Sequence, residues 1–273
     1  MTLSELNRLI INELTESLGS REAAATARLL LEDGLGIDQT TLLTRGDRNV
    51  EPETESRFRD YIRRIKSGEP PQYVVGHARF MGLDLAVTRD TLIPRPETAE
   101  LVDLVTDYAG RRSDLRILDA GTGTGCIAIA LARALPFARI TAIDISEAAL
   151  KVARQNAGNL RVNIEFVCAD ILSEKFSGLD IVVSNPPYIT DSERGSMERR
   201  VKDFEPASAL FVPDNDPLKF YRAILQNCTS TAYFFEINPL FAADLQSLVQ
   251  SMGYSSEILL DSFGRKRFAK ITV

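Results

Sequence analysis

The stretch LRILDAGTGTGCIAIALARAL, residues 115–135, decides the fold. Its first six residues are mostly apolar and predict a buried strand, and residues 126–135 predict an apolar helix that ends before Pro136. Between the two, glycine occupies every second position from Gly121 to Gly125, which lets the backbone turn tightly and approach a ligand. A strand, a glycine turn and a helix in this order are typical of α/β proteins.

From residue 115 onward, strands and helices largely alternate, and the chain ends with two successive strands. Further strands are expected at 138–144, 163–170, 179–187, 232–237, 256–261 and 267–273. Helices are expected at 97–108, 146–156, 217–227 and 240–252. Because repeated βα units with apolar, β-branched strands form parallel sheets, the sequence predicts a parallel sheet covered by helices on both faces.

The first seventy residues have a different pattern, in which apolar residues recur at helical spacing. They predict three short amphipathic helices, and their 10 basic and 13 acidic side chains give a net charge of −3. From 76 to 90 the apolar period changes to two on either side of Gly82, which predicts a β-hairpin. We therefore expect a helical domain at 1–75, a β-hairpin linker at 76–95 and an α/β domain at 96–273.

Composition excludes several classes of function. With 44% apolar and 26% charged residues, the 273-residue chain is neither a disordered nor a fibrous protein. Three scattered cysteines and a single histidine, His77, argue against a disulfide framework, a zinc site or a catalytic triad. A net charge of −6 gives no general attraction for nucleic acid, and no apolar run reaches the roughly 18 residues of a membrane span. We expect a cytoplasmic protein without a metal site.

Acidic residues end three consecutive expected strands, at Asp119, Asp144 and Asp170. The carboxyl ends of parallel strands lie at one edge of the sheet, where open α/β proteins bind their ligands. Any one of these carboxylates has a purely structural interpretation as a solvated residue at a strand end. Three in succession, the first of them beside a glycine turn, favour a ligand site.

The glycine turn departs from the dinucleotide-binding pattern G-x-G-x-x-G, because Cys126 stands at the third glycine position. Alternate glycines behind an acidic residue suit a ligand with a carboxylate and an ammonium, such as the methionine end of S-adenosylmethionine. In this interpretation Asp144 accepts hydrogen bonds from both ribose hydroxyls, as acidic residues do in nucleotide-binding βαβ units. Asp170 would accept a hydrogen bond from the adenine amino group.

The segment Asn185-Pro186-Pro187-Tyr188 follows an apolar strand. Proline pairs are common in turns, so the segment has a structural interpretation. It also has a chemical one, because the Asn185 side-chain oxygen and the Pro186 carbonyl can accept the two hydrogens of an –NH2 group, while the Tyr188 ring stacks on the planar group that carries it. Two such acceptors raise the electron density on a poorly nucleophilic nitrogen and direct its lone pair at a methyl donor.

On these motifs the chain resembles the class I S-adenosylmethionine-dependent methyltransferases and, among them, the peptide chain release factor glutamine methyltransferases of the PrmC/HemK family. The resemblance runs from the helical N-terminal residues through Leu92-Ile-Pro-Arg-Pro-Glu-Thr98, Phe204-Glu-Pro206 and Gly264-Arg265-x-Arg267. It implies a Rossmann-like, seven-stranded, mostly parallel sheet with a small N-terminal helical bundle. Ile171 stands where some members of the family have a tryptophan.

The resemblance implies methyl transfer from S-adenosylmethionine to the side-chain amide nitrogen (N5) of the glutamine in the Gly-Gly-Gln motif of release factors, with S-adenosylhomocysteine as product. The implied catalytic residues are Asn185, Pro186 and Tyr188, which together with Pro187 would hold the glutamine. The implied cofactor-binding residues are Asp119, Gly121, Thr122, Gly123, Thr124, Gly125, Asp144, Asp170, Ile171 and Asn185. The implied partner is a release factor docked on the helical domain, with no nucleic acid, no membrane and a monomeric chain.

Two alternative functions stay open on the sequence. Asn-Pro-Pro-Tyr also occurs in adenine-N6 DNA methyltransferases, so one alternative is methylation of an amino group on adenine in nucleic acid. That activity needs a basic groove, for which the acidic balance of the first seventy residues gives no support. The other alternative is a regulatory module that binds the cofactor without catalysis, and it leaves the Asn-Pro-Pro-Tyr segment without a purpose.

Overall fold

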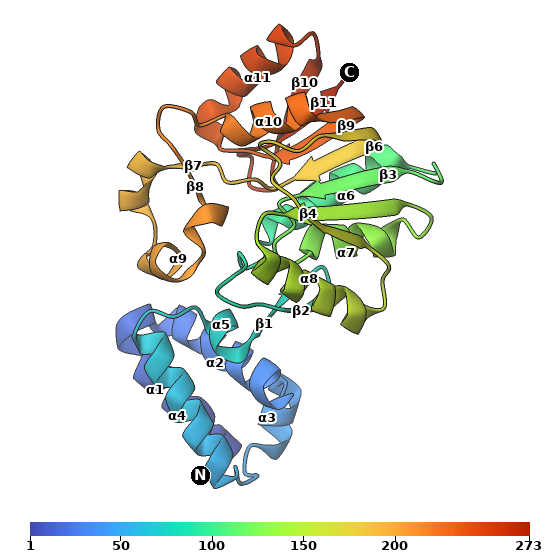
Figure 1. The fold of residues 1–273 in the computed structure, drawn as a ribbon. Coiled ribbons are helices and arrows are strands. Elements are labelled where there is room, and N and C mark those ends of the chain that lie inside the picture. The colour runs from blue at the N-terminus through green and yellow to red at the C-terminus, as the bar shows by residue number, and fades with distance from the viewer. The chain divides into compact units, whose positions relative to one another are not determined.

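The computed structural model describes residues 1–273 without a gap, and the chain separates into two compact units. The first unit consists of Met1–His77 and Glu198–Phe204, and the second consists of Ala78–Met197 and Glu205–Val273. Figure 1 shows the fold, with most of the helices and strands labelled. None of the helices combines the length and the apolar character that crossing a bilayer requires.

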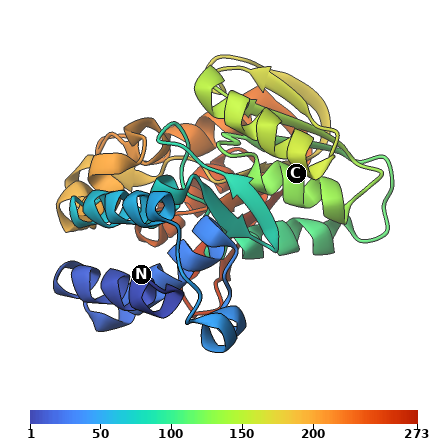
Figure 2. The same cartoon turned by 90° about the horizontal axis from the view of Figure 1, so that it is seen from below.

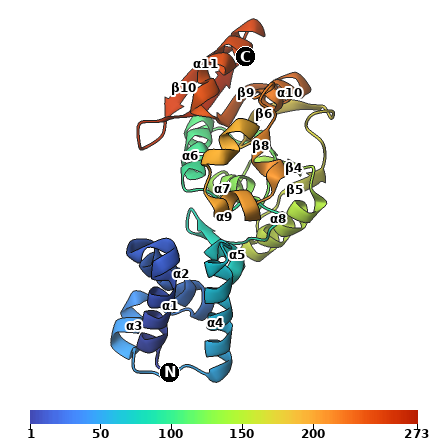
Figure 3. The ribbon, with the colours of Figure 1, turned by 90° about the vertical axis from the view of Figure 1, so that its left-hand side faces the viewer.

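The first unit is a helical bundle, and Figure 3 shows its long helices lying alongside one another. Its helices are α1 (Leu3–Leu18), α2 (Ser20–Leu35), α3 (Gln39–Arg45), α4 (Pro52–Lys66), α5 (Pro71–Val75) and α9 (Arg199–Phe204). The apolar stripes of α1, α2 and α4 meet in a core whose completely buried side chains include Leu6, Ile10, Leu14, Leu30 and Phe58. These three helices are the amphipathic helices that the apolar spacing predicts. The spacing does not indicate α3, because none of its residues is buried.

Helix α9 belongs to the bundle although it follows α5 by more than a hundred residues. Arg200 of α9 forms an ion pair with Glu22 of α2. Phe204 lies beside Gly68, where a Cβ atom would come within 3.4 Å of the phenyl ring. The bundle is therefore built from two separate stretches of the chain.

The second unit contains a seven-stranded sheet in the order β10-β11-β9-β6-β3-β4-β5. Its strands are β3 (Arg116–Ala120), β4 (Arg139–Asp144), β5 (Glu165–Cys168), β6 (Phe176–Ser184), β9 (Cys228–Glu236), β10 (Ser255–Leu260) and β11 (Lys266–Thr272). The five strands from β9 to β5 pair in parallel, whereas β11 pairs antiparallel with both β9 and β10. The predicted seven-stranded, mostly parallel sheet is confirmed.

Helices cover both faces of this sheet, because alternate side chains of each strand point to opposite faces. Ile117 of β3 lies in the apolar core formed with α6 (Glu97–Ala109), α7 (Cys126–Ala134) and part of α8 (Glu147–Leu160). The next residue, Leu118, lies in a second core formed with α10 (Lys219–Asn227) and α11 (Ala242–Ser251). The double covering predicted from the apolar strands is confirmed.

A short hairpin of β1 (His77–Phe80) and β2 (Leu83–Ala86) precedes the sheet and appears in teal in Figure 2. Asn156 of α8 fastens the end of the hairpin, since its side-chain amide accepts from the Ala86 nitrogen at 2.7 Å and donates to the Ala86 oxygen at 3.0 Å. The same amide also donates to the Thr124 carbonyl in the glycine turn at 2.9 Å. The remaining short elements are β7 (Ile189–Thr190), β8 (Phe211–Val212) and the 3-10 turns η1 (Asp191–Ser196), η2 (Ala207–Ala209) and η3 (Pro239–Phe241).

Candidate active site

A cavity of about 320 Å3 opens at the carboxyl ends of β3, β4 and β6, within the second unit. Its wall comes from the segment before α6, the glycine turn after β3, the end of β4 and the segments that follow β5 and β6. Side chains from residues 206–224 complete the wall. Among the residues predicted for the site, those that line the cavity are Gly121, Thr122, Gly123, Thr124, Asp144, Asp170, Ile171, Asn185, Pro186 and Pro187. The structure thus brings the predicted cofactor and substrate residues together. Asp119, Gly125 and Tyr188 lie behind this wall.

The glycine turn adopts a conformation that other residues rarely take. Gly121 and Gly123 have φ values of 76° and 54°, and a Cβ atom on either would meet nothing within 4 Å. Glycine is therefore needed there for its backbone freedom, and the turn faces open space on the cavity side. The amides of Gly121 and Thr122 both donate to the Ile143 carbonyl at 2.9 Å, so β4 holds the turn in place.

Asp119 supports the turn from behind. Its side chain is completely buried, and its Oδ2 accepts from the Thr122 hydroxyl at 2.6 Å and from the Ala128 amide at 3.2 Å. Burial raises the pKa of Asp119 to about 7, although the two hydrogen bonds act in the opposite direction. The predicted role in cofactor binding is therefore indirect in this structure, through the position of Thr122 and the start of α7.

Asp144 links the end of β4 to the glycine turn. Its Oδ2 accepts from the Gly123 amide and its Oδ1 from the Ser146 amide, each at 2.9 Å. The carboxylate is half-buried and lines the cavity, and a carboxylate has about four acceptor positions, so each oxygen can accept once more. This arrangement suits the binding of a vicinal diol such as that of a ribose.

The far side of the cavity is largely apolar. Ile145 and Ile171 line it, and Ile145 is 64% exposed. Asp170 accepts from the Leu172 amide at 2.9 Å, which fixes the loop after β5. A flat aromatic group such as an adenine ring fits between apolar side chains of this kind. Sequence patterns do not indicate Ile145, because it follows the predicted strand rather than belonging to it.

The Asn-Pro-Pro-Tyr segment begins where β6 ends. The Ser184 hydroxyl donates to the Ala120 carbonyl at 2.6 Å, which ties the end of β6 to the end of β3. Asn185 donates from Nδ2 to the Thr98 hydroxyl at 3.2 Å and lines the cavity with Pro186. The side-chain oxygen of Asn185 is the amide atom left to accept a hydrogen bond from a ligand.

Tyr188 lies behind the cavity wall, with its hydroxyl donating to Oε1 of Glu236 at 2.9 Å. Burial, and then the Glu236 charge, raise the pKa of the Tyr188 phenol, so the phenol stays neutral. The stacking of this ring on a substrate stays a prediction. Its position in the structure is that of a support for the loop after Asn185.

Two residues of the site are not indicated by the motifs that carry the chemistry. One is Thr98, in the Leu92–Thr98 segment, and the other is Glu236, at the end of β9. The Thr98 hydroxyl donates to Glu236 Oε2 at 2.8 Å. The signal that could have drawn attention to Glu236 is a lone carboxylate at the end of the apolar stretch AYFFE, residues 232–236. Burial of a carboxylate is unfavourable unless the group is paired or hydrogen-bonded, so a carboxylate at this position indicates specific partners.

S-adenosylmethionine fits the residues that are present. The open turn offers backbone to a polar ligand end, Asp144 keeps acceptor capacity for hydroxyls, and the apolar side of the cavity suits adenine. These three features suit the amino acid, the sugar and the base of this molecule, respectively.

Comparison with known proteins identifies the family. The release factor glutamine methyltransferase of Bacteroides thetaiotaomicron is 37% identical over 97% of this chain and 98% of its own length. The chain belongs to the release factor glutamine methyltransferase family. The family's relative from Flavobacterium psychrophilum is 33% identical over 99% of both chains. Two family models agree, as the PrmC N-terminal domain matches residues 8–76 and the methyltransferase small domain matches residues 101–203.

Membership of the release factor glutamine methyltransferase family confirms that the chain is an enzyme that uses S-adenosylmethionine, as predicted. Solved structures agree on the fold. The hMettl16 catalytic domain, in complex with the MAT2A 3'UTR hairpin 6, matches with a TM-score of 0.52 over 82% of both chains at 15% identity. The human methyltransferase 10 domain containing protein matches with a TM-score of 0.50 over 70% of this chain and 89% of its own, at 18% identity.

Proposed function

We propose that this chain methylates the side-chain amide nitrogen (N5) of the glutamine in the Gly-Gly-Gln motif of peptide chain release factors. The family supports the substrate, because relatives that span the whole chain are named release factor glutamine methyltransferases. The observation that carries the proposal is the orientation of Asn185, whose Nδ2 is bonded to Thr98 and whose Oδ1 stays available beside the cavity. That oxygen suits the NH2 group of a glutamine amide.

The residues around the cavity divide the binding of the cofactor among them. In the proposal, the turn from Gly121 to Thr124 borders the methionine end, Asp144 accepts from the ribose hydroxyls, and the segment Asp170–Ile171 borders the adenine. Asp119 holds the turn from behind through Thr122. When bound, S-adenosylmethionine supplies an electrophilic methyl group on a positively charged sulfur.

The Asn-Pro-Pro-Tyr segment prepares the amide for attack. Asn185 Oδ1 and the Pro186 carbonyl accept the two N–H groups of the substrate, which raises the electron density on the nitrogen and aims its lone pair. Methyl transfer would form a new N–C bond as the C–S bond of the donor breaks, and the nitrogen would then release one proton to water. No strong base is needed, because the nitrogen becomes acidic only after it gains the methyl group.

The division of the chain is part of the same proposal. The helical domain at 1–75 would dock the release factor, the hairpin at 76–95 would act as a linker, and residues 96–273 would carry out the transfer. The supporting observation is that the helical domain has its own apolar core and an acidic balance suited to a basic partner surface. We propose that the enzyme works as a cytoplasmic monomer without nucleic acid.

Mass spectrometry tests the substrate directly. A purified bacterial release factor is incubated with the enzyme and methyl-labelled S-adenosylmethionine, and the peptide that contains the Gly-Gly-Gln motif is sequenced. We expect one methyl group on the glutamine side chain, and none on a control release factor whose motif glutamine is replaced by alanine.

An adenine-containing DNA or RNA oligonucleotide in a parallel reaction tests the alternative substrate. Label in the oligonucleotide together with an unmodified release factor would contradict the proposal and favour nucleic-acid methylation. Label on another residue of the release factor would keep a protein substrate but reject the assigned glutamine.

A further inference from the structure

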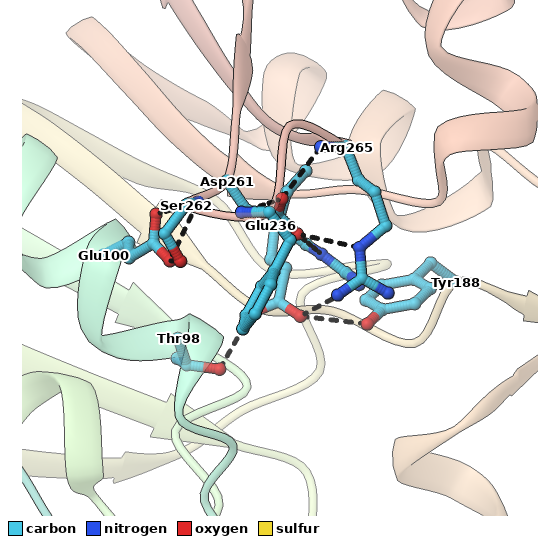
Figure 4. A network of polar contacts seen from close by, with 9 residues as sticks. Thr98, Glu100, Tyr188, Glu236, Asp261, Ser262 and Arg265 are labelled. Atoms are coloured by element: carbon cyan, nitrogen blue, oxygen red, sulfur yellow. Dashed lines mark hydrogen bonds and ion pairs between the residues drawn. The ribbon is translucent and has the colours of Figure 1, made fainter.

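A chain of hydrogen bonds runs from the cavity into the protein interior and ends at Glu236. Asn185 Nδ2 donates to the Thr98 hydroxyl at 3.2 Å, and the Thr98 hydroxyl donates to Glu236 Oε2 at 2.8 Å. The Tyr188 hydroxyl donates to the other carboxylate oxygen, Oε1, at 2.9 Å. Figure 4 shows Thr98 and Tyr188 on two sides of Glu236. Thr98 and Glu236 are only 2% and 1% exposed.

A second layer of charge lies beyond Glu236. Arg267 of β11 places its guanidinium 4.0 Å from Glu236 Oε1 and 3.5 Å from Asp261 Oδ2. Asp261 also pairs with Arg265 at 3.4 Å and accepts from the amides of Phe263 and Arg265. Burial raises the pKa of Glu236, whereas the hydrogen bonds from Thr98 and Tyr188 and the charge of Arg267 favour the carboxylate.

The direction of these hydrogen bonds follows from whether each group can donate or accept a hydrogen bond. A carboxylate only accepts, so the single O–H of Thr98 must point at Glu236. With its proton committed, the Thr98 oxygen can only accept from Asn185. The amide of asparagine has an oxygen and a nitrogen of nearly the same shape, and only the nitrogen is a donor. The Nδ2 atom of Asn185 is therefore held toward Thr98, and Oδ1 is held away from it.

We propose that Glu236 is a positioning residue that, through the Thr98 hydroxyl, fixes which end of the Asn185 amide meets the substrate. This inference rests on the proposed function, in which Asn185 Oδ1 accepts from the glutamine NH2 group. If the amide were reversed, its NH2 group would face the substrate NH2 group, and two donors would oppose each other. The Glu236 carboxylate also stabilises the Asn-Pro-Pro-Tyr segment, because it accepts the hydrogen bond from the hydroxyl of Tyr188, three residues after Asn185.

Three substitutions separate this role from simple packing. Thr98→Val keeps the shape of the side chain but removes the hydroxyl, so nothing selects the orientation of Asn185. Thr98→Ser keeps the hydroxyl and loses only a methyl group. Glu236→Gln places an amide that can donate to Thr98, which lets the Thr98 proton turn toward Asn185 and reverses the selection. Thr106→Val is the matched control, because Thr106 lies on the same helix and donates to the Val102 carbonyl at 2.9 Å, outside this chain of bonds.

The experiment measures kcat and KM for a release factor, the Kd for S-adenosylmethionine by calorimetry, and the Tm of each variant. We expect kcat to fall about 10- to 100-fold for Thr98→Val and Glu236→Gln, because a misplaced reacting group costs about this much. The Kd for the cofactor should change less than about 2-fold in the Thr98 variants, since the hydroxyl is removed from the substrate side only. Thr98→Ser should recover kcat to within about 3-fold of the unmodified enzyme.

Three results would overturn the proposal. One is a Thr98→Val enzyme whose kcat stays within about 2-fold of that of Thr106→Val. Another is a Thr98→Ser enzyme as slow as Thr98→Val, because then shape rather than the hydroxyl matters. The third is a parallel loss of kcat and cofactor affinity, which indicates a general collapse of the site.

A double-variant measurement tests the route through Asn185. If Thr98 acts by orienting Asn185, then Thr98→Val should cause no further loss in single-turnover rate when Asn185 is already alanine. A full additional loss would overturn the proposal. Methylation of adenine instead of glutamine would contradict the proposed function. In that case the rates of Thr98→Val and Thr98→Ser on adenine would still be compared, and their ratio would decide whether the Thr98 hydroxyl positions Asn185.

Discussion

The glycine turn and the Asn-Pro-Pro-Tyr segment line the same cavity, yet they are held in different ways. The turn is fixed locally, because its amides bond to Ile143 and Asp144 on the neighbouring strand and its glycines accept an unusual φ. Asn185 is fixed by side chains from distant parts of the chain, through Thr98 to Glu236. One half of the site is a backbone structure, and the other is a side-chain network.

Because they are held differently, the two halves of the site should respond differently to mutation. A backbone turn binds a ligand through groups that every residue has, so it tolerates exchange of side chains that do not change its φ angles. A side-chain network fails when one donor or acceptor is removed, because the partner is left unsatisfied in a buried place. Side-chain substitutions within the glycine turn should therefore affect cofactor binding less than substitutions in the network affect methyl transfer.

The largest effect is expected for Asn185→Ala. We expect kcat to fall by about 100- to 1000-fold, the loss seen when one hydrogen-bonding group of a reaction site is removed. The Kd for S-adenosylmethionine should stay within about 3-fold, because the acceptor that is removed serves chiefly the reacting amide of the substrate. Stopped-flow or single-turnover kinetics and calorimetry measure the two quantities. An equal loss in both would break the division between the two halves.

Asp144→Ala should give the converse result. It removes the carboxylate that is bonded to Gly123 and Ser146, and cofactor binding should weaken by about 1–3 kcal/mol because charge-assisted hydrogen bonds are lost. At saturating cofactor the rate of methyl transfer should be nearly restored. Glu147→Ala, at an exposed position in the first turn of α8 and outside the cavity lining, is the matched control for the loss of a carboxylate. Calorimetry that shows an unchanged Kd for Asp144→Ala would remove this residue from the ribose site.

The contribution of Asp119 to the free energy of unfolding should depend on pH. Its pKa is about 7 in the folded protein and near 3.9 when unfolded, so between these values the folded state binds more protons. The stabilising contribution is complete below about pH 4 and is lost as the pH rises through 7. Relative to Asp119→Asn, the wild-type free energy of unfolding should fall by about 2 kcal/mol from pH 5 to pH 7. Urea unfolding at both pH values measures this, and a parallel pair of curves would contradict it.

The smallest effect is expected in the helical bundle. Glu16 and Glu53 are exposed acidic residues, and their replacement by lysine should raise the KM for a release factor by about 2- to 3-fold at low salt. The kcat and the Kd for S-adenosylmethionine should not change. Glu257→Lys, on an exposed position of β10, is the matched control. Equal KM values for all three variants would count against docking on the bundle.

Sequence patterns predict the local half of the site and the scaffold that carries it. The period of apolar residues indicates the parallel sheet and its helices, because each strand must be buried on both faces. The glycine turn and the carboxylates at the strand ends can be located in the same way, since they follow directly from the strands they end.

The network half cannot be predicted in this way. Thr98 and Glu236 are 138 residues apart in the sequence, and their contact depends on how α6 and β9 lie in the folded chain. Tyr188 has an aromatic ring, which favours a stacking interpretation, but its hydroxyl lies on Glu236. Which end of a side chain is used is decided by its neighbours in space, and a single sequence does not list them.

The membership of α9 in the helical bundle affects how this protein can be dissected. The seven residues Glu198–Phe204 join the bundle, although both of their ends continue into the other unit. Cutting the chain after residue 77 would leave Arg200 without Glu22, and the Phe204 ring without its place at Gly68. A fragment without residues 1–77 would therefore expose a partly apolar segment that normally packs in the bundle. Any loss of its activity could come from failed docking or from failed folding, and the two causes would not be separated. Point changes on the bundle surface give a cleaner answer than excision.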